Sequence, residues 1–585
     1  MFKLFRTLKK SDWGLILASV VLIVGQVWLD LKMPDYMSRI TRLVQTEGSA
    51  MSEILGAGGM MLLCALGSLV SSACVAILAG RIATNFGAGL RRRLFSKVHS
   101  FSMEEIGRFS TASLITRSTN DVTQVQMVIV MGLQVMIKAP ITAGMAIGKI
   151  SGKAWQWTLA TVIAIALLLV IITVGIILAL PKFRKVQELT DDLNRVTREN
   201  LTGLNVVRAY NAEGYQQNKF DRANLNLTNN HLFTSRVMST LMPGISLVTS
   251  GLSLSIYWIG AGLIQQAGLM SKIGLFSDMV VFLSYAMQIV MAFMMLVMIF
   301  IILPRASVAA KRINEVLNTQ PTIVDPAQPK APAGVSGEVE FRHVNFRYPD
   351  AEGDVLHDIT FSAHRGETVA LIGATGCGKS TVINLVPRFY EATEGQVLVD
   401  GQDVREWNQQ ELRNRIGYVS QRAILFGGTV KSNIAYGDNG QAAPGDDAIH
   451  DAIATAQAAE FVDRLEDGID GFVAQGGTNL SGGQKQRLSI ARAIARHPEI
   501  LIFDDSFSAL DYKTDRVLRG ALAKECAEAT KLIVAQRIGT IRDADRIIVL
   551  EDGHIAGQGT HDELMRTCEV YQQIAYSQLS KEELA

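Results

Sequence analysis

A glycine-rich stretch in the second half of the chain has the residues and the spacing to bind phosphates. Residues 373–380 read GATGCGKS, which fits the pattern GxxxxGK[ST], between an apolar strand pattern and a helical pattern. Glycines let such a loop wrap its N–H groups around phosphates at a helix N-terminus, while the lysine adds charge and the hydroxyl can bind Mg²⁺. The sequence therefore predicts a nucleotide-binding loop made of Gly373, Ala374, Thr375, Gly376, Cys377, Gly378, Lys379, Ser380 and Thr381.

A second stretch, ILIFDD at residues 500–505, is an apolar run that stops on two adjacent acids. It predicts a buried strand, and one carboxylate at the end of such a strand is common at a metal–phosphate site. Asp504 fits that role. The acid that follows it, Asp505, needs an explanation that the rest of the chain must supply.

A third stretch, LSGGQ at residues 480–484, predicts another anion site. Ser481 is expected to cap a helix that Gly482 and Gly483 open and that Pro498 stops, and the exposed N-terminus of such a helix attracts anions. One nucleotide needs only one phosphate cradle. The second cradle is therefore best explained if it serves a nucleotide held by a different chain.

The composition indicates a membrane protein with more than one domain. The chain has 585 residues, well above the roughly 150 expected for one domain. It is 48% hydrophobic and only 19% charged, which is too apolar for an ordinary soluble protein. The net charge of +1 gives no indication of nucleic-acid binding, and the five cysteines lack metal-binding spacing and are expected to be free thiols.

The apolar residues concentrate in the first half, where six stretches are long enough to cross a bilayer as helices. Six such stretches in about 320 residues argue against buried core helices, and the first is too long for a signal peptide. The predicted spans are residues 13–33, 54–78, 128–147, 155–180, 242–264 and 275–303.

Basic residues predict the orientation of these spans. They crowd the connections between spans two and three and between spans four and five, whereas the other connections are shorter and poorer in charge, although Lys149, Lys153 and Lys272 lie there. The positive-inside rule then places both termini and the two long connections in the cytoplasm. The protein is therefore expected to be a multi-pass protein of the cytoplasmic membrane with its second half in the cytoplasm.

A segment rich in proline and small residues, 318–336, is the predicted linker between the two halves. The expected domains are a six-helix transmembrane domain over 1–317 and an α/β nucleotide-binding domain over 337–585. The long connections, 79–125 and 181–240, read as charged helix. They predict spans that continue into the cytoplasm and turn back near 103–111 and 210–217, forming two coupling loops.

In this order of motifs the chain resembles the ATP-binding cassette (ABC) exporters over essentially its full length, and LSGGQ is its most specific motif. The resemblance implies an α-helical six-span domain fused to a P-loop domain, and two such chains that sandwich two ATP molecules head to tail. Each ATP lies between one P-loop and the opposite LSGGQ. The nucleotide ligands it implies beyond the P-loop are Tyr348, Gln421, Ser481, Gly482, Gly483 and Gln484, and the implied Mg²⁺ ligands are Ser380, Gln421 and Asp504.

The chain departs from the family's pattern at three places. Hydrolysing relatives have a glutamate that polarises water where this chain has Asp505, whose carboxylate is retracted by ~1.5 Å, about one C–C bond. The family's switch histidine is replaced by Gln536, and glutamine cannot gain or lose a proton near neutral pH. Gln475 and Gly476 stand where many exporters have a Glu-Arg pair.

These departures resemble the degenerate-site subunit of heterodimeric, multidrug-type bacterial ABC exporters. The implied function is ATP-driven export, with ATP and Mg²⁺ bound but poorly used at the chain's own catalytic positions, Asp505 and Gln536. Its LSGGQ would complete the hydrolytic site of a partner half-transporter that carries the glutamate and the histidine. The expected substrate is small and amphiphilic, with the lipid bilayer as surroundings and no nucleic-acid partner.

Two alternatives stay open. The chain can be an ATP-gated membrane regulator that moves nothing, or a homodimeric lipid or peptide exporter in which Asp505 is a weaker base. Within the spans, Asp30 and Lys138 fit either an inter-helix pair or the lining of a polar cavity. The methionines of span six fit a packing stripe or a flexible apolar site; they are Met287, Met291, Met294 and Met298.

Overall fold

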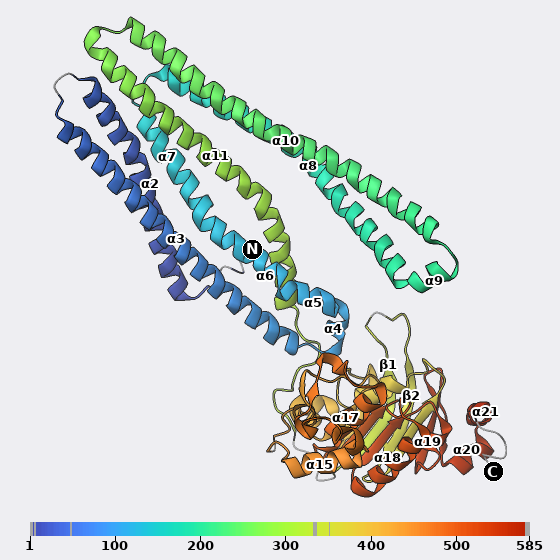
Figure 1. The fold of residues 1–585 in the computed structure, drawn as a ribbon. Helices are drawn as coiled ribbons and strands as arrows, with labels where there is room; N and C mark the ends of the chain where they lie inside the picture. Colours follow the sequence, from blue (N-terminus) through green and yellow to red (C-terminus); the bar gives the residue numbers. More distant parts are fainter. Residues whose placement is uncertain are drawn as a thin grey trace. The chain divides into compact units, whose positions relative to one another are not determined.

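A computed structural model describes residues 4, 8–46, 49–330, 336–349, 351–440 and 442–578. The chain divides into two compact units (Figure 1). The first comprises Met1–Lys97 and Ala112–Thr319, and the second comprises Val98–Thr111 and Gln320–Ala585. Residues 331–335 of the predicted linker lie outside the described residues.

The first unit is helical and contains six helices or helical stretches that are long and apolar enough to cross a membrane. This confirms the predicted six-span architecture. The spans are carried by α2 (Lys10–Gln45), α3 (Met51–His99), α6 (Asn120–Met131) with α7 (Lys138–Ile150), α8 (Trp155–Thr202), α10 (Glu213–Gln266) and α11 (Leu269–Asn318).

The third span is interrupted by a π-helical stretch, Gly132–Ile137, between α6 and α7. Pro140 follows it within the first turn of α7. Proline has no N–H and its ring crowds the preceding turn, so the helix widens there instead of continuing as a regular α-helix. The break separates the two halves of this span.

The longest helices exceed what a bilayer requires. A span needs about 20 residues, whereas α3, α8 and α10 have 49, 48 and 54 residues. The helices α8 and α10 run side by side as a hairpin closed by α9 (Leu204–Ala209), as Figure 1 shows. The second turn therefore comprises α9 and the residues up to Glu213, where α10 begins. It starts slightly earlier than the predicted range, 210–217. The first contains α4 (Met103–Phe109) and precedes α5 (Thr111–Ser118).

Within the spans, Asp30 and Lys138 form an inter-helix ion pair with 3.5 Å between Nζ and Oδ2, and the Ser68 hydroxyl donates a hydrogen bond to Asp30. The pair satisfies both charges in hydrocarbon, which favours the structural alternative. Of the span-six methionines, Met294 packs on the buried core of this unit, whereas Met291 is 55% exposed. The side chain of Met298 lies outside the described residues.

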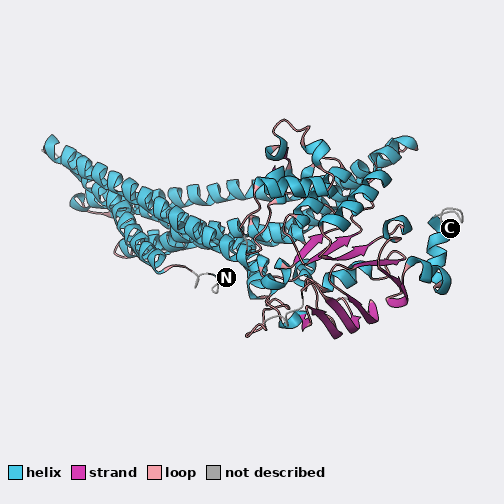
Figure 2. Ribbon diagram, turned by 90° about the horizontal axis from the view of Figure 1, so that it is seen from below, coloured by secondary structure: helices cyan, strands magenta, loops and turns pink. Residues whose placement is uncertain are grey.

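The second unit holds the strands (Figure 2). Its six-stranded sheet has the order β12-β11-β3-β10-β9-β6, in which only β12 pairs antiparallel among the described strands. The strands are β12 (His554–Gly559), β11 (Arg546–Glu551), β3 (Thr368–Gly373), β10 (Thr530–Val534), β9 (Ile500–Asp504) and β6 (Ile416–Val419).

A smaller antiparallel sheet packs beside it in the order β2-β1-β4-β5. Its strands are β1 (Val339–Phe346), β2 (Leu356–Ala363), β4 (Glu394–Val399) and β5 (Gln402–Asp403). Helices surround the sheets; those used below are α12 (Lys379–Leu385), α13 (Gln409–Asn414), α17 (Gly482–Ile494) and α18 (Tyr512–Glu525). Every residue of β9 and β10 is buried, as expected for central parallel strands with both faces covered.

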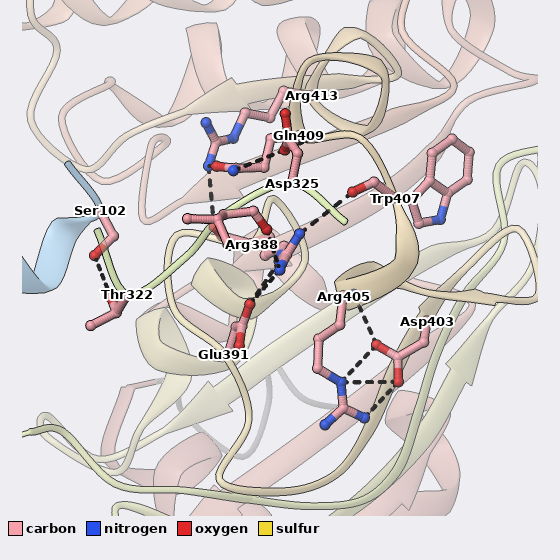
Figure 3. Close-up of polar contacts among 11 residues, drawn as sticks. Ser102, Thr322, Asp325, Arg388, Glu391, Asp403, Arg405, Trp407, Gln409 and Arg413 are labelled. Carbon is pink, nitrogen blue, oxygen red and sulfur yellow. Dashed lines mark hydrogen bonds and ion pairs between the residues drawn. The ribbon is translucent and has the colours of Figure 1, made fainter. Parts of the chain in front are cut away.

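Contacts with charged groups hold the start of the linker on the second unit (Figure 3). The buried guanidinium of Arg388 donates to the Val324 carbonyl at 3.1 Å and binds one Glu391 oxygen at 2.8 and 2.6 Å. The Asp325 carboxylate accepts from the backbone and side-chain nitrogens of Gln409, each at 3.0 Å. Residues 324–325 are therefore held on the domain by hydrogen bonds that involve charged groups, which are stronger than hydrogen bonds between neutral groups.

Candidate nucleotide-binding site

The topology brings the predicted site residues to one edge of the six-stranded sheet. The strands β3, β10, β9 and β6 are parallel neighbours, so their carboxyl ends meet there. Ligands of open parallel sheets bind in the crevice beyond these ends. The P-loop follows β3, Asp504 ends β9, Gln536 follows β10 and Gln421 follows β6.

The P-loop is a tight turn that requires its glycines. Gly376 and Gly378 have φ of 90° and 99°, in the left-handed region that glycine enters at no steric cost. A Cβ on Gly378 would also lie 2.6 Å from Leu356 Cδ2. The Lys379 ammonium donates to the carbonyls of Gly373 and Ala374 at 2.9 and 2.7 Å. The lysine thus lies against the loop that would receive phosphate.

Two predicted metal ligands are in direct contact. The Ser380 hydroxyl at the start of α12 donates to Asp504 Oδ1 at 2.7 Å. Burial raises the pKa of Asp504 above its usual value, although the bond from Ser380 opposes this. A hydroxyl and a carboxylate beside a phosphate loop are the hard oxygen donors that Mg²⁺ prefers, so these residues fit the ion.

Two of the residues that depart from the family's pattern, Asp505 and Gln536, also contact each other. Gln536 Nε2 donates to Asp505 Oδ2 at 2.9 Å, and Gln421 Nε2 donates to the same oxygen at 3.2 Å. Burial raises the pKa of Asp505, and hydrogen bonds to its side chain oppose the rise. The sequence suggested each departure separately, and the structure joins them in one network.

The backbone at Asp505 is itself unusual. Its φ of 47° lies in the left-handed region, where aspartate and asparagine are several-fold enriched over longer side chains. Its N–H donates to the Val534 carbonyl of β10 at 3.0 Å, and its own carbonyl accepts from the Ser508 hydroxyl at 2.9 Å. Ser508, which the sequence did not mark as a contact of this acid, therefore helps to fix the turn.

The predicted adenine-stacking residue, Tyr348, is held beside the P-loop helix. Its hydroxyl lies 3.0 Å from the Thr381 hydroxyl of α12. Its ring makes edge contacts with the rings of Phe346 and Tyr390, with centroid distances of 4.8 and 5.2 Å. These contacts fix the orientation of the Tyr348 ring. The side chain is half-buried.

The LSGGQ segment forms the predicted capped helix. The Ser481 hydroxyl accepts from the Gln484 N–H at 3.3 Å, and Gln484 Oε1 accepts from the Ser481 N–H at 2.8 Å. This reciprocal capping box starts α17. Ser481 and Gly482 are exposed, and a Cβ on Gly482 would meet no atom within 4 Å. The start of this helix therefore has room for an outside group.

Comparisons with known proteins assign the family. A family model described as "ABC transporter" matches residues 356–508, and one described as "ABC transporter transmembrane region" matches residues 16–293. An uncharacterized ABC transporter ATP-binding protein of Mycobacterium tuberculosis is 41% identical over 528 residues, which cover 90% of this chain and 88% of the relative. This chain belongs to the ABC transporter family.

Other relatives of this ABC transporter agree. An ATP-dependent lipid A-core flippase of Pseudomonas putida is 34% identical over 480 residues, covering 81% of this chain and 77% of the flippase. A solved structure, a bacterial Atm1-family ABC exporter with ATP bound, has a TM-score of 0.78 at 24% identity. The match covers 97% of this chain and 98% of the exporter chain. The chain thus has the ABC exporter fold, with six membrane spans and a cytoplasmic ATPase domain, and its family couples ATP hydrolysis to transport.

A contact that the sequence analysis missed ties the first cytoplasmic turn of the ABC transporter to the linker. Glu105 of α4 is buried and accepts from the Ser102 N–H at 2.8 Å, the Ser102 hydroxyl at 2.6 Å and the Thr322 N–H at 3.0 Å. The two hydroxyls of Ser102 and Thr322 are 3.0 Å apart (Figure 3). The pattern S-x-x-E at 102–105 was the available signal for the cap.

Replacing Glu105 with glutamine is expected to weaken the hydrogen bonds that hold Thr322 of the linker on α4. Burial alone would raise the pKa of Glu105, but the hydrogen bonds from Ser102 and Thr322 outweigh it and lower the pKa below its ordinary value. A carboxyl with a lowered pKa stabilises the fold above its usual pKa, and the stabilisation is lost as pH falls through the lowered value. The change should cost roughly 1.5 kcal/mol at neutral pH, as for a hydrogen bond to a charged group.

Limited proteolysis of the full-length protein measures this effect at residues 320–330. The Glu105→Gln variant should be cleaved faster than wild type at pH 7, and the difference should shrink as the pH falls through the lowered pKa of Glu105. Glu104→Gln is the matched control, since Glu104 lies next to Glu105 in α4 and has no hydrogen bond among those described. Equal cleavage of all three proteins at pH 7 would contradict the prediction.

Proposed function

We propose that this chain is one subunit of a heterodimeric ABC exporter and that its own nucleotide site binds ATP but hydrolyses it slowly. The observation that carries the proposal is the network at Asp505, whose Oδ2 accepts from Gln421 and Gln536 at 3.2 and 2.9 Å. A general base must reach the water that it activates to within hydrogen-bond distance. Here the carboxylate is short, and its oxygen is held by two amides that cannot take up a proton.

The remaining site residues support binding. The P-loop amides and Lys379 would hold the phosphates of ATP, and Tyr348 would stack on adenine. Ser380 and Asp504, which are 2.7 Å apart, would hold Mg²⁺ together with Gln421. When bound, the ion neutralises phosphate charge. The chain therefore has the side chains expected for ATP binding, whereas the expected base and switch residues are replaced by Asp505 and Gln536.

The productive site would form on a partner chain. The capped start of α17 at Ser481 and Gly482 is exposed and open, and a helix N-terminus attracts phosphate. This chain would supply that LSGGQ to ATP held by the partner's P-loop. The partner would carry the glutamate and the histidine that this chain lacks.

The proposed substrate is a small amphiphilic, drug-like molecule. A second candidate, a homodimeric lipid exporter, is favoured by the similarity to proteins named lipid A-core flippases in Pseudomonas putida and Aromatoleum aromaticum, at 34% and 32% identity. Both candidates require flux through the six spans. The third alternative, an ATP-gated regulator, requires nucleotide-dependent motion alone.

Transport in reconstituted vesicles separates these candidates. The full-length chain is inserted alone and together with a half-transporter that has the glutamate and the histidine. ATP-dependent uptake of an amphiphilic dye into inside-out vesicles only with the partner present would support the proposal. Brisk flipping of a labelled lipid by the chain alone would favour the homodimer, and ATP-dependent conformational change without flux in either sample would favour the regulator.

A further inference from the structure

A cavity of about 440 Å³ lies between α2, α7 and α11, lined by residues from the last part of α2, the end of α7 and the early part of α11. The lining residues of α2 follow the predicted end of span one at residue 33, and Lys149 and Lys153 follow the predicted end of span three at residue 147. The lining residues of α11 lie near the predicted start of span six at residue 275. With the N-terminus in the cytoplasm, these three ends are external. The exposed Trp155, which starts the next span, fits the interfacial level at which tryptophan concentrates.

The cavity is basic, against the usual distribution of charge across a membrane. Basic residues are normally enriched on the cytoplasmic side, so a group of them at an external interface needs a reason. The cations that line this cavity are Arg39, Arg42, Lys149 and Lys153.

Acidic neighbours neutralise only part of this charge. Asp278 is shared between Arg42 and Lys153. Asp35 pairs with Lys149 at 2.6 Å, and it also accepts from the buried Tyr285 hydroxyl at 2.6 Å. Among the described residues Arg39 has neither an ion pair nor a hydrogen bond.

Two carboxylates therefore face four lining cations, and one of these cations is unpaired in the described part of the chain. Guanidinium and ammonium groups with charge to spare bind phosphate through charge-assisted hydrogen bonds. The same cavity has apolar walls from Leu43 and Val281. Val44, next to Leu43, is 65% exposed.

We propose that this cavity binds the phosphate headgroup of an anionic lipid of the external leaflet. Arg39 carries the contact together with Lys149, whose partner Asp35 is shared with the Tyr285 hydroxyl, while Arg42 and Lys153 remain paired with Asp278. The apolar walls and the exposed face of α2 accommodate the first part of the acyl chains. The proposal is independent of whether the exporter is a homodimer or a heterodimer and of what it transports.

Native mass spectrometry of the full-length protein, titrated with phosphatidylglycerol, tests the site. The double variant Arg39→Gln/Lys149→Gln should bind about 25-fold more weakly, from about fivefold per cation, which is the roughly 1 kcal/mol that a basic residue contributes at an anionic surface. Lys272→Gln is the matched control. Lys272 of α11 is likewise a cation near an external end of a span, but it does not line the cavity. Unchanged ATP binding verifies that each variant is folded.

The expected result is weakened phosphatidylglycerol binding in the double variant alone, with weaker binding of zwitterionic phosphatidylcholine to wild type. Wild-type affinity in the double variant, or an equal loss in Lys272→Gln, would overturn the site. Displacement of phosphatidylglycerol by millimolar inorganic phosphate would overturn the lipid assignment in favour of a soluble anion.

Discussion

Replacing Gly482 with aspartate is expected to reduce ATP hydrolysis by the assembled exporter by at least about a hundredfold. The substitution places a carboxylate at the exposed start of α17, where the proposal puts the phosphates of the partner's ATP. Two like charges about 4 Å apart repel by roughly 4 kcal/mol at an interfacial dielectric, which exceeds the 2.7 kcal/mol of a hundredfold change.

The structure makes this test sharper than a change at Ser481. A Cβ on Gly482 would meet no atom within 4 Å, so a side chain there leaves this chain's own fold intact. Ser481, in contrast, caps the helix, and its removal would destabilise α17 by about 1 kcal/mol as well. Gly482→Ala is the matched control, since it fills the same space without charge.

Steady-state ATPase rates of the reconstituted pair measure the effect, together with ATP binding to the isolated chain. Gly482→Asp should reduce turnover by at least about a hundredfold while this chain's own ATP binding is kept, and Gly482→Ala should retain most of the rate. If Gly482→Asp left turnover unchanged, LSGGQ would not face a nucleotide. If it abolished ATP binding to the chain alone, the two cradles would serve the same molecule.

Restoring the family's residues at the base and switch positions is expected to raise hydrolysis at this chain's P-loop by about a hundredfold, since a misplacement of about 1 Å in a catalytic group costs that much. The double variant is Asp505→Glu/Gln536→His. Glutamate returns the missing methylene, and histidine provides a group that titrates near neutral pH. The left-handed backbone at residue 505, with φ of 47°, costs a longer side chain about 1 kcal/mol, well below the expected gain.

The two substitutions belong together because Gln536 donates directly to Asp505. Residues in one hydrogen-bond network couple, so the double variant should exceed the product of the two single variants. Single-turnover hydrolysis, in a complex whose partner base is replaced by glutamine, isolates this site. Asp505→Asn serves as the control and should leave the already slow rate within a few-fold of wild type.

The opposite result is equally clear. If the purified wild-type chain hydrolysed ATP briskly by itself and Asp505→Ala abolished that activity, Asp505 would be a working base. The homodimeric alternative would then replace the asymmetric one.

Local patterns were enough to predict the membrane domain and the phosphate loop. Spans are continuous apolar runs of fixed minimum length, because the bilayer has a fixed thickness and leaves no partner for unpaired backbone groups. The P-loop is equally local, since its glycines, lysine and hydroxyl lie within eight residues, 373–380. The position of the second cytoplasmic turn was less accurate, because a charged helix gives no sharp local signal for where it reverses.

Long-range contacts could not be predicted in this way. Asp505 and Gln536 are separated by 31 positions and meet only because β9 and β10 are parallel neighbours. Glu105 and Thr322 are separated by 217 positions, and Arg39 and Lys149 line one cavity from different helices.

The sequence by itself determined the ABC transporter architecture, and it predicted the phosphate-binding residues and the two departures at the expected catalytic positions. Only the tertiary structure decided that the two departures share one hydrogen-bond network, that Asp30 pairs with Lys138, and that external cations converge on a cavity. The physical reason is that the first set depends on local patterning and residue type. The second depends on which helices and strands pack side by side, and the packing is set by the summed burial of many side chains.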